Sequence, residues 1–163
     1  TSINKKLAVF AAENLDNTSF DVIDLRDFEM PMYSEDEEKN GFSENAKKFS
    51  SLLDTYDGFI LSLAEHNGSY AAAFKNIFDW SSRIEATVFR DKPLLLMATS
   101  LGEMGGRFVL EAGTQKFSRM GAKELISFSF PNFHDNFKEG EIIHKDLLKS
   151  LKEHLVKFEN AVN

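Results

Sequence analysis

Residues 59–83 read FILSLAEHNGSYAAAFKNIFDWSSR, and this stretch decides the fold class. An apolar run ends abruptly at the polar residues 65–69, and an amphipathic helical pattern follows. The order predicts a buried strand at 58–64, a turn at its carboxyl end, and a helix over 69–83. Gly68 allows a backbone conformation that other residues resist, and Ser69 is placed to cap the helix. Ligands bind at this kind of edge in open α/β sheets, so the turn is a candidate ligand loop.

Helices and strands alternate along the rest of the chain. The continuous apolar run PLLLMAT at 93–99 is typical of a strand in a parallel sheet. The other predicted strands are 20–25 and 124–130, and the other predicted helices are 2–14, 43–54, a helix that follows Gly106 and ends at Gly121, and 144–160. This alternation predicts one domain over residues 1–163, with a parallel sheet covered by helices on both faces.

The alternation begins on a helix, and no strand precedes Thr1. A sheet of this type needs a central first strand that leads into the first helix. We therefore expect that this strand and the start of the following loop are absent from the present sequence.

Composition excludes several classes of function. The net charge of −7 argues against nucleic-acid binding, and no apolar stretch approaches the roughly 20 residues that a membrane helix needs. The chain has no Cys, and its four His lack metal-ligand spacing, so we expect no disulfide, no thiolate catalysis and no metal site. Sixteen Phe indicate either an aromatic-rich core or a subunit interface.

Two further segments are candidates for binding. Residues 1–4 combine hydroxyl and amide side chains with the free amides of a helix start, which suits an anion, although a plain helix cap explains them too. Residues 100–106 carry glycines at 102, 105 and 106, which suggests close approach of a ligand to the backbone. The GxxGG spacing lacks the acidic residue of a dinucleotide-binding motif. An ordinary turn remains an alternative for 65–69, with His66 as an exposed loop residue.

The polar motifs together carry a family resemblance. Their order is S-x-N at a helix start, E-x-N-G-S-Y after a strand, K-N-x-x-D-W in the next helix, and T-S-x-G-x-x-G-G. This order resembles the NADPH-dependent FMN reductase family, which includes quinone and azo-dye reductases of flavodoxin-like fold. The segments MPMY at 30–33 and FPNF at 130–133 also look like family segments, so the resemblance covers nearly the whole chain.

The resemblance implies a three-layer α/β sandwich of flavodoxin-like fold, with parallel strands in the order 2-1-3-4-5. It implies FMN at the sheet edge, NADPH or NADH as reductant, and a quinone, flavin or similar small molecule as acceptor. It also implies a cytoplasmic homodimer, or a tetramer built from dimers. Ser2 and Asn4 would hold the phosphate. The residues that would border the flavin ring are Glu65, His66, Asn67, Gly68, Ser100, Leu101, Gly102, Gly105 and Gly106. We expect no catalytic side chain, because the cofactor carries the electrons.

One departure from the family pattern lies beside the expected ring. Ala64 and His66 stand where the family usually has the Pro and Tyr of P-E-Y-N. His66 therefore either alters contact with the flavin or its substrates, or points to solvent. Two other functions fit the sequence: a flavodoxin-like electron carrier without a nicotinamide site, and a non-catalytic α/β binding domain.

Overall fold

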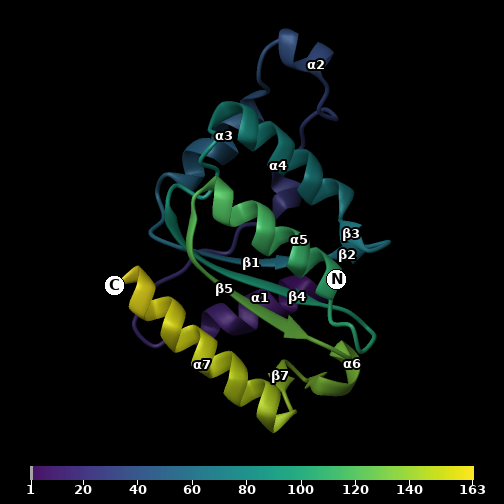
Figure 1. The fold of residues 1–163 in the computed structure, drawn as a ribbon, viewed down its shortest axis with the longest axis vertical. Coiled ribbons are helices and arrows are strands. Elements are labelled where there is room, and N and C mark those ends of the chain that lie inside the picture. Colours follow the sequence, from purple (N-terminus) through teal and green to yellow (C-terminus); the bar gives the residue numbers. More distant parts are fainter. Residues whose placement is uncertain (1) are drawn as a thin grey trace.

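The computed structural model describes residues 2–163, and its centre is a parallel sheet (Figure 1). Within these residues the sheet has the order β1-β4-β5, made of β1 (Phe59–Leu63), β4 (Lys92–Thr99) and β5 (Ala122–Phe130). Leu95 of the central strand is paired with Ile60 on one side and Ile126 on the other. The predicted strands at 58–64, 93–99 and 124–130 are therefore confirmed.

Helices cover both faces of this sheet (Figure 1). On one face, α1 (Ile3–Glu13) and α7 (Lys145–Val162) pack against Leu95 and Met97 of β4. On the other, Leu94 and Leu96 of the same strand belong to a core shared with α3 (Glu44–Leu53), α4 (Ala72–Ile84) and α5 (Arg107–Phe117). Successive side chains of a strand point to opposite faces, so a strand covered twice must be apolar throughout. The three-layer α/β fold is confirmed.

The strand predicted at 20–25 is wrong. Residues 20–24 are not paired with any described strand, Phe20 and Val22 are 43% and 51% exposed, and Leu25 already belongs to a 3₁₀ turn at Leu25–Asp27. Among the described residues β1 is paired with β4 alone, so no neighbour offers 20–25 a ladder of hydrogen bonds, which a strand needs. The order β1-β4-β5 fits the last three positions of 2-1-3-4-5 and does not test the first two.

The helix predicted at 69–83 begins later than expected. Residues 65–70 form a hairpin of β2 (Glu65–His66) and β3 (Ser69–Tyr70), and α4 begins only at Ala72. The turn is Asn67-Gly68, with φ of 52° and 72°, which matches the Asn-Gly turn favoured in two-residue hairpins. Ser69 is paired with His66 across this hairpin, so the prediction that it caps α4 is wrong.

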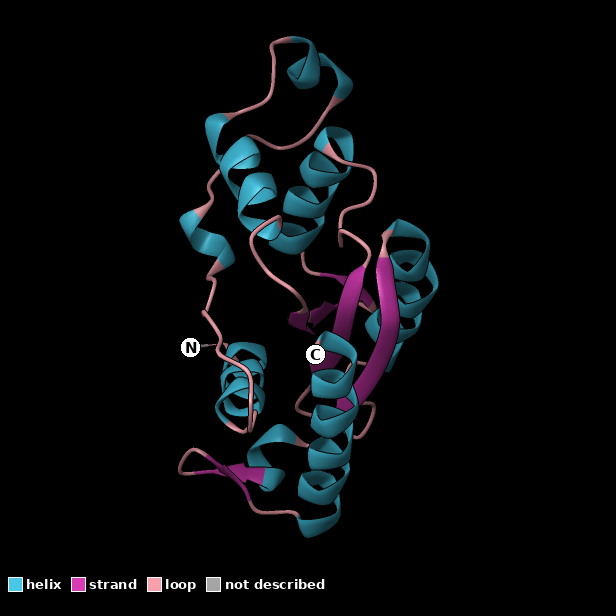
Figure 2. Cartoon of the chain, turned by 90° about the vertical axis from the view of Figure 1, so that its left-hand side faces the viewer, coloured by secondary structure: helices cyan, strands magenta, loops and turns pink. Residues whose placement is uncertain are grey.

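Several short elements were not predicted. They are α2 (Glu35–Lys39), a 3₁₀ turn at Ser118–Met120, α6 (Phe133–Asn136), and a hairpin of β6 (Phe137–Lys138) and β7 (Glu141–Ile142). Figure 2 shows the last hairpin beside the start of α7, away from the central sheet. Gly121 has φ of 84° and follows the 3₁₀ turn after α5, which confirms its predicted role in ending that helical segment.

The aromatic side chains of the α4 region pack inside the chain. Phe117 is fully buried, and its ring centroid lies 4.9 to 6.0 Å from those of Tyr70, Phe74, Phe78 and Phe89. Trp80 is also fully buried. These rings belong to the core, and their number gives no argument for a subunit interface.

Candidate functional site

The candidate loops gather at the carboxyl end of the sheet. Because β1 and β4 are parallel neighbours, the β2–β3 hairpin that follows β1 lies beside the 100–106 loop that follows β4. The start of α1 is held at the same edge through Asn4, as described below. The structure thus brings together the three segments that the sequence singled out, apart from Thr1, which lies outside the described residues.

Asn4 is directed into the protein. It is 6% exposed, and its Oδ1 accepts hydrogen bonds from the Ser62 hydroxyl (2.8 Å) and the Thr99 amide (3.1 Å). Its Nδ2 donates to the Thr99 carbonyl at 3.3 Å. The side chain therefore fixes the start of α1 to the ends of β1 and β4. Ser2 is exposed, and its Oγ accepts from the Lys5 amide at 3.2 Å as an ordinary helix cap.

The hairpin exposes its tip and anchors its base. His66, Asn67 and Gly68 are exposed, whereas Glu65 is half-buried and its Oε2 accepts a hydrogen bond from the Val109 amide at 3.0 Å. A β-carbon added at Gly68 would lie 3.9 Å from the Phe108 ring. The tip therefore adjoins the first turn of α5, and its backbone is accessible.

The three glycines of the 100–106 loop have different roles. Gly105 and Gly106 are buried with φ of 56° and 75°. A β-carbon at Gly105 would collide with Ser129, and one at Gly106 would lie 2.6 Å from the Ala98 side chain. Packing against the sheet therefore explains both. Gly102 is exposed, and within residues 2–163 an added β-carbon there meets no atom within 4 Å.

Hydrogen bonds fix the backbone conformation of the 100–106 loop. The Gly102 carbonyl accepts from the Ser100 hydroxyl (3.1 Å) and the Asn132 amide (3.0 Å), and the Ser100 carbonyl accepts from the Phe133 amide (3.0 Å). The FPNF segment at 130–133, which resembles a family segment, therefore holds the 100–106 loop through two backbone hydrogen bonds. Backbone is therefore accessible at Gly68 and at Gly102, on two neighbouring loops, and we call this place the cradle. Accessible glycine backbone permits the close approach of a flat ring such as flavin.

Sequence reasoning missed Phe108. Its ring is 51% exposed beside the hairpin tip, and it stands outside the buried stripe of α5. Leu101 and Met104 are also exposed, by 65% and 47%. The available signal was an apolar residue at a helix start that the core-facing periodicity does not require. Apolar side chains are therefore exposed in and directly after the 100–106 loop, and we call these three residues the apolar rim.

The MPMY segment and the K-N-x-x-D-W motif form one structural unit. Asn76 accepts a hydrogen bond from the Tyr33 amide (2.8 Å) and donates to the Pro31 carbonyl (3.1 Å). The Trp80 indole also donates to Pro31, at 2.8 Å. Glu38 accepts hydrogen bonds from the Arg83 guanidinium and from the Tyr33 hydroxyl, and both bonds lower the pKa of Glu38. The same bond to Glu38 raises the pKa of Tyr33.

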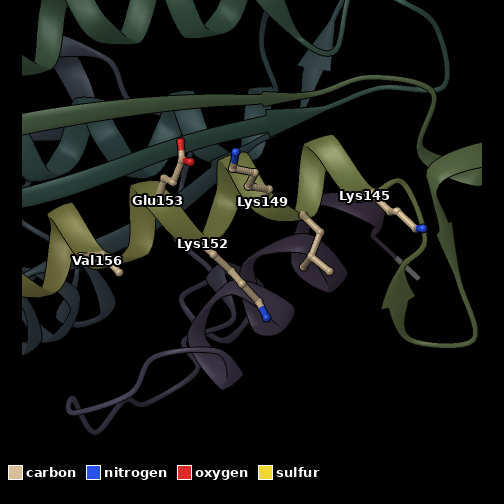
Figure 3. A pocket seen from close by; sticks show the side chains of 6 residues that line it. Lys145, Lys149, Lys152, Glu153 and Val156 are labelled. Atoms are coloured by element: carbon tan, nitrogen blue, oxygen red, sulfur yellow. The ribbon is translucent and has the colours of Figure 1, made fainter.

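Two open grooves lie on the surface. One, of about 440 Å³, lies along α7, away from the loops described above (Figure 3). It is lined by Lys145, Leu148, Lys149, Lys152, Glu153 and Val156. The second, of about 600 Å³, adjoins the loop at Met104 and lies between α5 and β5. Its lining cation, Arg107, is paired with Glu111 at 2.8 Å. Within residues 2–163, no cluster of three or more His, Asp or Glu side chains is arranged to hold a metal ion.

Comparison with known proteins agrees with the architecture of the site. Residues 1–135 match the profile of the NADPH-dependent FMN reductases, which spans the motifs of all three loops. The chain belongs to the NADPH-dependent FMN reductase family. As a member of this family it is a flavin-dependent oxidoreductase, and its cofactors are FMN and NAD(P)H.

The chain shares about a third or less of its residues with individual relatives and solved structures. The chain is 30% identical to the uncharacterized protein MG342 homolog of Mycoplasma pneumoniae. The 142 aligned residues cover 83% of this chain and 83% of that protein. It is 34% identical to a 2-hydroxy-1,4-benzoquinone reductase of Burkholderia sp., over 64% of this chain and 56% of that enzyme. FerB, a flavoenzyme NAD(P)H:(acceptor) oxidoreductase from Paracoccus denitrificans, superposes with a TM-score of 0.75 over 99% of this chain and 90% of its own, at 20% identity. This last likeness shows the shared fold.

No helix within residues 2–163 is long and apolar enough to cross a membrane.

Proposed function

We propose that this chain passes electrons from NADPH or NADH to a small, flat, apolar acceptor such as a quinone. When bound, FMN supplies the two-electron chemistry. The observation that carries the proposal is the pair of accessible glycine backbones, Gly68 and Gly102, at the carboxyl edge of a sheet whose loops bear the family motifs. The benzoquinone reductase among the relatives supports the acceptor class.

The proposed FMN site uses the backbone more than side chains. The amides of the hairpin tip and of the glycine loop would border the ring, and the capped start of α1 at Ser2 would face the phosphate. Asn4 holds the start of α1 against the ends of β1 and β4. The residues proposed to face the ligand are Ser2, His66, Asn67, Gly68, Ser100, Leu101 and Gly102, and the residues proposed to shape the loops around it are Asn4, Glu65, Gly105 and Gly106.

The apolar rim defines the acceptor. Leu101, Met104 and Phe108 are exposed in and directly after the 100–106 loop, and a flat apolar ring bound there would cover surface that is otherwise in contact with water. No side chain is required to move a proton, and His66 at the exposed tip is free to contact the acceptor. The groove beside Met104 offers no unpaired cation among its lining residues, so we expect little preference for the 2′-phosphate of NADPH over NADH.

A spectrum of the full-length protein with FMN, followed by anaerobic addition of NADPH and then NADH, tests this function. Bound flavin that loses its yellow colour without a partner protein supports it. Flavin that binds but is reduced only by a partner protein indicates an electron carrier, for which the net charge of −7 is suited. A protein that takes up no FMN contradicts both functions and leaves a non-catalytic binding domain.

Assembly and location are further parts of the proposal. The family resemblance supports a cytoplasmic homodimer, or a tetramer built from dimers, with the flavin loops near the subunit contact. Light scattering at micromolar concentration tests the assembly, and a monomer in the presence of FMN would contradict it.

A further inference from the structure

Glu65 makes a long-range contact that the function described so far does not use. Its Oε2 accepts a hydrogen bond from the Val109 amide, 44 residues further along the chain, at 3.0 Å. The side chain is half-buried. It therefore faces the protein, whereas His66, Asn67 and Gly68 of the same hairpin are exposed.

The helix that Glu65 contacts has no cap of its own. The residue at its cap position is Gly106, which offers no side chain, and the first turn of α5 carries no acidic residue. The first amides of a helix lack partners within the helix, and a carboxylate there gains both a hydrogen bond and the attraction of the helix dipole. Glu65 thus provides from another segment what α5 lacks.

The hairpin in turn needs an anchor. Its ladder comprises only the pairs Glu65–Tyr70 and His66–Ser69, and so short a ladder has little stability alone. Tyr70 holds one strand through its ring, which stacks on Phe117, and the Glu65 bond holds the other strand. Gly68 at the tip then lies beside Phe108 on the same turn of α5. The position of the 65–70 hairpin relative to the 100–106 loop, which leads into α5, therefore depends on the bond between Glu65 and the Val109 amide.

We propose that Glu65 is a positioning residue that locks the 65–70 hairpin to the start of α5, and that it does not bind the flavin directly. The proposal rests on the proposed function in that the two locked loops form the FMN cradle. It carries an electrostatic consequence. The Glu65 carboxylate offsets the positive end of α5, so it disfavours the additional negative charge of reduced FMN.

Two substitutions of Glu65 separate the effect of its hydrogen bond to Val109 from the effect of its negative charge. Glu65→Gln keeps an oxygen that accepts from Val109 and removes the charge, whereas Glu65→Ala removes both. Glu111→Gln is the matched control, because it removes a carboxylate from α5 whose partner is Arg107 and which makes no bond to the hairpin.

The first measurement is hydrogen exchange of the Val109 amide in FMN-free protein. We expect about tenfold or more faster exchange in Glu65→Ala, since a hydrogen bond to a charged group is lost. Glu65→Gln should stay within about threefold of the parent because the acceptor remains, and Glu111→Gln should match the parent. Unchanged exchange in Glu65→Ala would overturn the proposal.

The second measurement is affinity for oxidised and reduced FMN. Glu65→Ala should weaken oxidised FMN by about fivefold or more because the hairpin loosens. Glu65→Gln should keep oxidised affinity within about twofold and favour reduced FMN by about threefold, or roughly 14 mV for a two-electron couple. If Glu65→Gln loses oxidised FMN as severely as Glu65→Ala while Val109 stays protected, Glu65 is a direct ligand and the proposal is wrong. A parent protein that binds no FMN refutes the proposed function, and the exchange measurement still decides the lock.

Discussion

Replacing Asn4 with Ala should destabilise the fold through the junction of α1 with two strand ends. Three hydrogen bonds are lost at one buried position, each worth roughly 1 kcal/mol net. The amide of Thr99, a residue that is 2% exposed, is left without that partner. Ala is the better helix former by roughly 0.5 kcal/mol. The expected loss in the free energy of unfolding is therefore about 2.5 kcal/mol.

Urea unfolding of FMN-free protein measures this loss, and a thermal scan should show a fall in Tm of roughly 5–10 °C for a chain of this size. Asn45→Ala is the matched control, because its amide makes a single exposed hydrogen bond to the Glu29 carbonyl at 2.7 Å. Asn4→Asp keeps both accepting interactions but turns a carboxylate oxygen toward the Thr99 carbonyl, so it should also destabilise. A change at Asn4→Ala no larger than at Asn45→Ala would refute this account of the junction.

Four further predictions concern the site and one buried carboxylate. Gly102→Val should leave Tm within about 2 °C but weaken FMN binding at least about tenfold, whereas Gly106→Val should lower Tm itself; equal effects on Tm would contradict their different surroundings. Phe108→Ala should raise KM for a quinone by about fivefold with kcat nearly unchanged, measured by steady-state kinetics. His66→Tyr should leave kcat and KM nearly unchanged in steady-state kinetics, because the His66 side chain is exposed at the hairpin tip; a change of about tenfold in either constant would contradict this. Glu159 is buried, which alone raises its pKa, but amide hydrogen bonds from residues 16 and 17 lower it below its ordinary value. Its stabilisation is therefore present above about pH 4.5 and lost as pH falls through the lowered pKa, so Glu159→Gln should flatten the acid limb of stability against pH.

The sequence predicted those elements whose local pattern agrees with their tertiary surroundings. The run at 93–99 is apolar throughout because both of its faces are covered, and this double burial made the strand easy to recognise. The segment 20–25 also has a strand pattern, but pairing depends on a neighbouring strand, and no strand is paired with it within residues 2–163. Local pattern alone cannot supply that information.

The site was predicted at the level of loops and less well at the level of side chains. Asn67-Gly68 favours a tight hairpin, yet the helical pattern that follows led us to begin the helix at 69. The inward orientation of Asn4 and the Glu65 contact both depend on pairings between distant segments. Phe108 carried a weak signal, because a single apolar residue at a helix start is common on protein surfaces.

The unpaired edge of β1 has a consequence for handling the protein. FILSL at 59–63 contains no charge and no proline, and only one side of this strand is hydrogen-bonded to another strand among the described residues. Such an edge is a template on which a second chain can add a strand, so concentrated solutions of residues 1–163 should be prone to ordered aggregation. Asp57 and Glu65 flank the segment, and Asp57 is paired with Lys92 at 3.5 Å while Glu65 is bonded to the Val109 amide, so neither carboxylate is wholly available to repel a second chain.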